Sequence, residues 1–254
     1  MTTVISIHSF RGGTGKSNTT SNVAGHLAAS GARVAVIDTD IQSPGIHVLF
    51  GFADDLDNTL NDFLWGKIPI KDAAHDVTSL IAQSTPVAEG GALYLVPSSM
   101  KAGDIARVLR EGYDVGTLND GFRDLARDLQ LDYLLIDTHP GLNEETLLSI
   151  TISDILLLIL RPDRQDFQGT AVTVDVARKL GVPELFLVVN KVPVTTDVPD
   201  LESQMQAAYS AETAGVLPLS EEVVQNASAG LFSLTSPDHE WSKQIRRIAA
   251  RVTQ

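Results

Sequence analysis

Ser9-Phe10-Arg11-Gly12-Gly13-Thr14-Gly15-Lys16-Ser17-Asn18 is the stretch that decides the fold. It follows a short apolar run (residues 4–8) and opens a stretch with helical spacing of apolar residues (16–30). Its glycines allow close backbone approach, and N–H groups at a helix start point toward phosphate oxygens. Lys16 offers charge to β- and γ-phosphates, and Ser17 offers a hydroxyl to Mg²⁺. We therefore predict a phosphate-binding loop rather than an ordinary glycine-rich turn.

Short apolar runs alternate with helical patterns along the rest of the chain. The apolar runs are 4–8, 34–38, 93–96, 133–137, 155–160 and 185–190, with a shorter one at 216–218. The helical patterns are 16–30, 113–129, 167–180 and 220–229, and the stretch 83–91 is typical of a surface loop. Continuously apolar strands are expected when helices cover both faces of a parallel sheet. We predict an α/β fold, a doubly wound and mostly parallel sheet with helices on both faces, and residues 1–254 as one domain.

Composition excludes several classes of site. The 254 residues contain no cysteine, which excludes disulfides, cysteine nucleophiles, thiolate zinc sites and Cys-ligated iron–sulfur clusters. A net charge of −13 disfavours non-specific DNA binding, which depends on Lys and Arg contacts to phosphate. The longest aliphatic run, 155–160, is too short to cross a bilayer, and the N-terminus has no signal-peptide pattern. We expect a cytoplasmic protein.

Carboxylates follow two of the predicted strands. Asp38-Thr39-Asp40 closes one, and Asp137-Thr138-His139-Pro140-Gly141 closes another. Strand ends in open α/β sheets face the ligand crevice, so Asp38 and Asp137 are candidates to hold Mg²⁺ through its water shell, and Asp40 to orient an attacking water. The alternative for the Asp38–Asp40 pair is capping or turn formation. We expect His139 to form a hydrogen bond or pack rather than to act as a base.

Asn190-Lys191-Val192-Pro193 bears on the identity of the base. The Asn190 amide offers both a donor and an acceptor to a purine edge. A guanine-reading N-K-x-D motif needs a carboxylate where this chain has Pro193, so adenine is favoured. In the alternative interpretation, Asn190 only ends the strand in a turn.

Phe10 stands where the common phosphate-loop motif has its first glycine, and Gly12-Gly13-Thr14-Gly15-Lys16-Ser17 instead resembles the deviant Walker A motif, K-G-G-x-G-K-S/T, of the MinD/ParA family of ATPases. The family's signature lysine is replaced by Arg11. The D-x-D and D-x-x-x-G patterns and the segment after Val216 also resemble the family, so the similarity runs from residue 4 to about 252.

The resemblance implies a P-loop NTPase fold and assigns roles to named residues. Nucleotide contacts fall on Gly12, Gly13, Thr14, Gly15, Lys16, Ser17, Asn18, Asn190 and Pro218, metal contacts on Ser17, Asp38 and Asp137, and hydrolysis on Lys16, Asp40 and Arg11. In the relatives, the signature lysine reaches the partner's nucleotide across a dimer. For Arg11, pairing with a nearby carboxylate within its own chain is the alternative.

The implied function is a dimerising switch ATPase that uses ATP and Mg²⁺, hydrolyses slowly, and positions or partitions a cargo or regulates a partner. The ATP-bound form is expected to be a homodimer, with a protein partner stimulating hydrolysis. The alternative is an ATP-dependent biosynthetic enzyme, an amidotransferase or a carboxylase-like ligase, on the same fold. Such an enzyme needs a second catalytic constellation, which we do not find in the sequence.

The C-terminal stretch 241–254 bears on membrane contact. It places Trp241, Ile245, Ile248 and Val252 on one helical face and carries a charge of +4 against −17 elsewhere. This pattern imitates a membrane-targeting amphipathic helix, but it also fits the last helix of the fold packed on the core. We favour the packed helix, which disfavours membrane contact, and the acidic net charge disfavours DNA contact.

Overall fold

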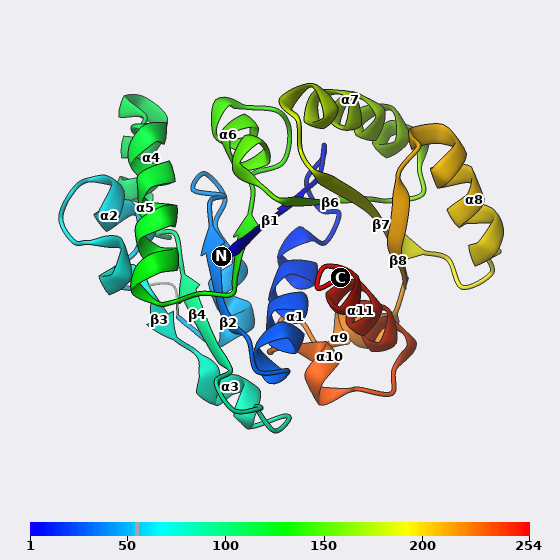
Figure 1. The fold of residues 1–254 in the computed structure, drawn as a ribbon, viewed down its shortest axis with the longest axis horizontal. Helices are drawn as coiled ribbons and strands as arrows, with labels where there is room; N and C mark the ends of the chain where they lie inside the picture. Colours follow the sequence, from blue (N-terminus) through cyan, green and yellow to red (C-terminus); the bar gives the residue numbers. More distant parts are fainter. Residues whose placement is uncertain (54–55) are drawn as a thin grey trace.

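An eight-stranded sheet forms the centre of the computed structural model, which describes residues 1–53 and 56–254 (Figure 1). The strand order is β3-β4-β2-β5-β1-β6-β7-β8, and all neighbours run parallel except β3 and β4. The strands are β1 (Thr3–His8), β2 (Arg33–Asp38), β3 (His75–Asp76), β4 (Ala92–Val96), β5 (Tyr133–Asp137), β6 (Ile155–Leu160), β7 (Glu184–Val192) and β8 (Glu212–Pro218). The predicted mostly parallel sheet is confirmed.

Helices connect the strands and cover the sheet. They are α1 (Lys16–Ala29), α2 (Leu60–Leu64), α3 (Thr78–Ala82), α4 (Ala102–Glu111), α5 (Val115–Asp128), α6 (Glu144–Ile152), α7 (Arg164–Leu180), α8 (Val198–Tyr209), α9 (Glu221–Gln225), α10 (Phe232–Thr235) and α11 (Glu240–Arg251). Two short 3₁₀ helices, η1 (Ile46–Phe50) and η2 (Ile70–Ala73), lie between β2 and β3.

Alternate side chains of the strands feed two opposite cores. In β2, Val34 and Val36 join the cluster formed with α1, α10 and α11, whereas Ala35 and Ile37 join the cluster formed with α5. A third cluster packs β6 and β7 against α7 and α8. Because strand side chains alternate between faces, helices on both sides of the sheet bury every position of β6.

The strand register brings three strand ends to one edge. Asp38 of β2 lies opposite Asp137 of β5, and Ile7 of β1 lies opposite the same residue on its other side. The chain leaves β1 for β2 on one side, and β6 later adds to the other side of β1. Such a reversal of strand order opens a crevice at the carboxyl ends of the strands.

Several predicted boundaries are wrong. Strands β7 and β8 are longer than the predicted 185–190 and 216–218, and the predicted helix 220–229 ends at Gln225 as α9. Ala227 and Ser228 have φ of 46° and 63°, a left-handed conformation that a helix cannot continue through. The predicted loop 83–91 is confirmed between α3 and β4.

The last helix packs on the core, as favoured from the sequence. Trp241, Ile245 and Ile248 of α11 are buried in the cluster that also holds α1. Helix α11 approaches β8 where Gly215 has no side chain, since a Cβ there would lie 2.7 Å from Ile248 Cγ1. Among residues 1–53 and 56–254, no helix is long and apolar enough to cross a membrane.

Candidate functional site

The loop between β1 and α1 owes its shape to two glycines. Gly13 and Gly15 have φ of 75° and 98°, in the left-handed region that side chains disfavour. Gly15 occupies the N-cap position of α1, so the helix begins at Lys16, whose side chain is largely buried. Gly12 lies next to Pro140, with 3.9 Å between its ideal Cβ and Pro140 Cγ. The backbone N–H groups of the first turn of α1 therefore lie at this loop, where they can bind phosphate oxygens.

Two residues at the end of β7 hold the loop from the other side. Asn190 Nδ2 donates a hydrogen bond to the Thr14 carbonyl at 2.7 Å, and Lys191 Nζ donates to the Gly13 carbonyl at 2.8 Å. Asn190 Oδ1 also accepts from the Lys191 N–H at 2.8 Å. A Cβ at Gly15 would lie 2.3 Å from Asn190 Nδ2, so the close approach of Asn190 is a second reason why glycine is needed at this position. Asn190 thus supports the loop in addition to any role toward a base, and sequence reasoning missed Lys191.

The acidic residues gather below the loop at the ends of β2 and β5. Ser17 Oγ donates to Asp137 Oδ2 at 2.6 Å, and Thr20 Oγ1 donates to Asp137 Oδ1 at 3.1 Å. Asp38 accepts from the backbone N–H groups of Asp40, at 3.0 Å, and Gly45, at 3.3 Å. Asp38 and Asp137 are each only 1% exposed.

Burial sets the electrostatics of this pair. Burial raises the pKa of Asp137 to about 6, and burial together with the Asp137 charge raises the pKa of Asp38 well above its usual range. A bound divalent cation would remove this penalty, since it pairs with carboxylate and hydroxyl oxygens. Ser17, Asp38 and Asp137 therefore fit a Mg²⁺ site by their donor atoms and by their need for positive charge.

Asp40 is held by a histidine from the neighbouring strand end. His139 Nδ1 lies 2.6 Å from Asp40 Oδ1, and the Ser43 N–H also donates to that oxygen at 3.2 Å. The expected hydrogen-bonding role of His139 is confirmed, and its partner is the residue that we predicted to orient water. Both side chains are partly exposed, 24% for His139 and 17% for Asp40, so solvent reaches them.

Arg11 pairs within its own chain. Its Nη1 donates to Gln165 Oε1 at 2.5 Å and lies 3.6 Å from Asp166 Oδ1, both at the start of α7. Phe10 packs on the same helix, where a Cβ at Gly169 would lie 2.1 Å from Phe10 Cδ1. Sequence reasoning missed Gly169, which accommodates the residue that replaces the usual first glycine of the loop.

A pocket of 360 Å³ adjoins the loop. Its lining includes Gly13, Gly15 and Asn18 from the loop and α1, Asn190 and Lys191 from β7, and Pro218, Leu219 and Ser220 after β8. The structure thus brings Asn18, Asn190 and Pro218, which we predicted to contact nucleotide, to one cavity beside the loop. Pockets of this volume hold small ligands and cofactors.

The family model of the ParA group, described as NUBPL iron-transfer P-loop NTPase, matches residues 1–253. The chain belongs to this family. Among ParA-family relatives, an uncharacterised ATP-binding protein of Methanocaldococcus jannaschii is 26% identical over 99% of this chain and 88% of its own length. An iron–sulfur cluster carrier protein of Pseudomonas fragi is 26% identical over 89% of this chain and 76% of its own length.

Solved structures share the ParA-family fold. The septum site-determining protein MinD of Pyrococcus horikoshii, complexed with Mg-ADP, superposes with a TM-score of 0.82 at 22% identity, covering 100% of this chain and 97% of that one. MinD of Aquifex aeolicus superposes at 0.80 with 20% identity over 99% and 96% of the two chains. The predicted resemblance and the P-loop NTPase fold are both confirmed.

Proposed function

We propose that this chain is a switch ATPase that binds Mg–ATP, closes into a homodimer and is released by slow hydrolysis. The observation that carries the proposal is the 2.6 Å contact between Ser17 of the loop and Asp137 of β5. It joins the phosphate-binding end of α1 to a buried carboxylate, the arrangement that a magnesium nucleotide requires.

The residues divide the work between binding and hydrolysis. The N–H groups from Gly12 to Ser17 would surround the phosphates, and the Lys16 ammonium would neutralise their charge. Ser17 and Asp137 would hold Mg²⁺, with Asp38 acting through its water shell. Bound Mg²⁺ supplies charge neutralisation to the transferring phosphoryl group. Asp40, held by His139, would orient the attacking water.

We place the base in the pocket formed by Asn18, Asn190 and Pro218, and we favour adenine. Pro193 stands where a guanine site needs a carboxylate, which supports this choice. Arg11 would leave Gln165 and Asp166 on dimerisation and reach the partner's nucleotide. Its planar fork can bridge two phosphate oxygens, as an arginine finger does in trans.

For the cargo, we propose a class of role and not a particular molecule. We infer a cytoplasmic role in positioning or partitioning a cargo or in regulating a protein partner that stimulates hydrolysis. Several relatives are named iron–sulfur cluster carriers or assembly factors. These 254 residues contain no cysteine, so the chain offers no thiolate for such a cluster, and we do not extend that role to it.

Replacing Lys16 tests the proposal. Lys16→Ala should abolish ATP binding in titration calorimetry while the circular dichroism spectrum stays unchanged, because Lys16, the first residue of α1, belongs to none of the described hydrophobic clusters. Lys101→Ala, which removes an exposed partner of Asp57, is the matched control and should bind normally. Wild-type protein should bind ATP more tightly than GTP. ATP binding by Lys16→Ala at wild-type affinity would refute the phosphate-loop assignment.

A further inference from the structure

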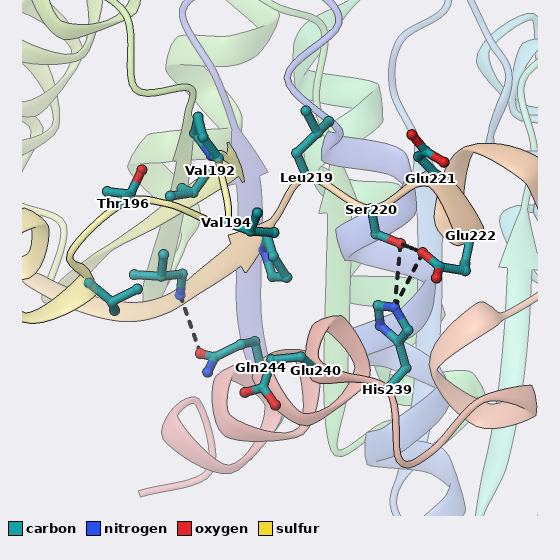
Figure 2. Close-up of a pocket in the computed structure, with 14 residues that line it drawn as sticks. Val192, Val194, Thr196, Leu219, Ser220, Glu221, Glu222, His239, Glu240 and Gln244 are labelled. Carbon is teal, nitrogen blue, oxygen red and sulfur yellow. Dashed lines mark hydrogen bonds and ion pairs between the residues drawn. The ribbon is translucent and has the colours of Figure 1, made fainter.

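A second and larger pocket adjoins the nucleotide-side pocket (Figure 2). Its volume is 640 Å³, and it lies among the end of β7, the loop to α8, the segment after β8 and the start of α11. Pro218, Leu219 and Ser220 line both pockets. This larger pocket is therefore separate from the phosphate loop but shares a wall with the nucleotide-side pocket, the 360 Å³ pocket beside the loop.

One side of this pocket is apolar and unusually exposed. Val194 is 83% exposed, Leu219 is 53% exposed and Val198 is 36% exposed. Figure 2 shows Val192, Val194 and Leu219 together on this side of the pocket. Large exposed apolar side chains that gather around a cavity mark a binding surface more often than isolated ones do.

Three carboxylates also line this pocket. Glu221, Glu222 and Glu240 line the pocket, and none of the described residues that line it is a lysine or an arginine. Ser220 Oγ donates to Glu222 Oε2 at 2.8 Å, and His239 Nε2 lies 3.7 Å from that same oxygen. Hydrogen bonds from its own backbone and from Ser220 lower the pKa of Glu222, so this carboxylate stays ionised.

This combination selects the chemistry of the occupant. Carboxylates around the pocket repel nucleic acid and anionic lipid, and a second copy of this chain carries a net charge of −13. An apolar side chain of a ligand would pack against the valine and leucine side chains of the pocket, and a neighbouring positive charge would pair with its carboxylates. We propose that this pocket binds a short segment of a partner protein in which apolar side chains are flanked by lysine or arginine.

The shared wall links this pocket to the nucleotide. Both ligands would contact Pro218, Leu219 and Ser220, so we expect binding of one to change the affinity for the other, and any such change is equal in both directions. The pocket itself does not depend on ATP hydrolysis, so peptide binding without nucleotide tests it independently of the proposed function.

The test uses the peptide acetyl-Lys-Leu-Leu-Lys-amide and the full chain labelled with ¹⁵N. We expect saturable NMR shifts at the amides of Val194, Leu219 and Glu222, and no binding of acetyl-Glu-Leu-Leu-Glu-amide. The double variant Glu222→Gln/Glu240→Gln should weaken binding about fivefold, because two exposed charge pairs are lost. Val194→Ser should also weaken binding, whereas Glu89→Gln, an exposed acid on the 83–91 loop, should not.

Three results would overturn the pocket assignment: no saturable binding, equal binding of both peptides, or shifts confined to another surface. Val194-dependent sedimentation with phosphatidylglycerol vesicles would overturn it too, in favour of a membrane. With saturating Mg–ATP, the peptide Kd should change at least about fivefold. An unchanged Kd at demonstrated ATP saturation would overturn the linkage, while failure of ATP to bind would contradict only the proposed function.

Discussion

Asp40 lies just after β2, yet the side chain that holds it comes from the segment after β5. The 2.6 Å contact with His139 Nδ1 leaves the Asp40 carboxylate in a fixed orientation at the edge of the candidate metal site. Asp38, two residues earlier, is buried, whereas Asp40 remains 17% exposed and in reach of water. Two acids in one short motif therefore have different environments, which suits one to the metal and the other to the attacking water.

Asp40→Ala should keep ATP affinity and lower the hydrolysis rate about 10²-fold, since it removes an orienting group rather than a phosphate contact. Calorimetry gives the affinity, and phosphate release at saturating ATP gives kcat. Asp175→Ala, an exposed acid on α7, serves as the control and should change neither quantity. Normal turnover in Asp40→Ala would remove Asp40 from the mechanism.

Motif reasoning named several residues of the candidate site but not the contacts among them. Lys16, Ser17 and Asp137 follow from local pattern, because a phosphate loop and an acidic strand end are short-range signals. Thr20 and Lys191 do not, because their partners lie 117 and 178 residues away in the chain. Such pairs are created by strand order and register, which residue spacing does not encode.

At the scale of elements, the contact between β8 and α11 fixes the last helix on the sheet. Gly215→Ala should lower the free energy of unfolding by about 1–3 kcal/mol, because the new methyl would lie 2.7 Å from Ile248 Cγ1. Gly103→Ala on α4 is the control, since no described residue from another part of the chain would lie within 4 Å of its Cβ, and alanine favours a helix. Urea unfolding measures the free energy of unfolding of both variants. A value for Gly215→Ala equal to that of the wild type would contradict the packed position of α11.

Helices α1 and α11 also meet at a half-buried histidine, His26. Burial, with the nearby Arg246 charge, lowers the pKa of His26 from 6.5 to about 4. The unfolded state therefore binds the proton first as pH falls, so this histidine lowers the free energy of unfolding between pH 6.5 and 4. His26→Gln should flatten the dependence of that free energy on pH across this window, as urea titrations at several pH values would measure. An unchanged slope would show that His26 is not protected from protonation in the folded chain.

The sequence predicted central elements better than those at the edge of the sheet. Strands β5 and β6 match the predicted 133–137 and 155–160 because both faces are covered, and the apolar run then equals the strand. The edge strand β8 begins at Glu212, an exposed polar residue, so a search for apolar runs does not find the start of this strand. The predicted helix 220–229 is longer than α9, because the helical spacing of apolar residues continues past Gln225 whereas the helical backbone ends there.

At the scale of the whole molecule, Arg11 connects the loop to α7 within one chain. Gln165 and Asp166 hold its guanidinium, and Arg161 shares the same Asp166 carboxylate through a 2.9 Å contact. Release of Arg11 would therefore leave Asp166 neutralised by Arg161. This arrangement lets Arg11 change partners without leaving an unpaired carboxylate, which suits a residue that moves on dimerisation.

Arg11→Ala should bind ATP normally, dimerise weakly and hydrolyse slowly, because the charge that it would add to the partner's phosphates is lost. Arg123→Ala, an exposed arginine on α5, is the control and should behave as wild type. Sedimentation with Mg–ATP and phosphate release measure the two effects. Wild-type dimerisation together with wild-type turnover in Arg11→Ala would leave the contact with α7 as its only role.

The most direct test of the switch is the mass of the Asp40→Ala variant in sedimentation equilibrium, with Mg–ATP and with Mg–ADP. Because this variant should hydrolyse bound ATP about 10²-fold more slowly than wild type, we predict a particle of twice the 27.2 kDa chain mass with ATP and of the single chain mass with ADP. A single-chain mass in both nucleotides, at concentrations where calorimetry shows ATP bound, would contradict the ATP-dependent dimer.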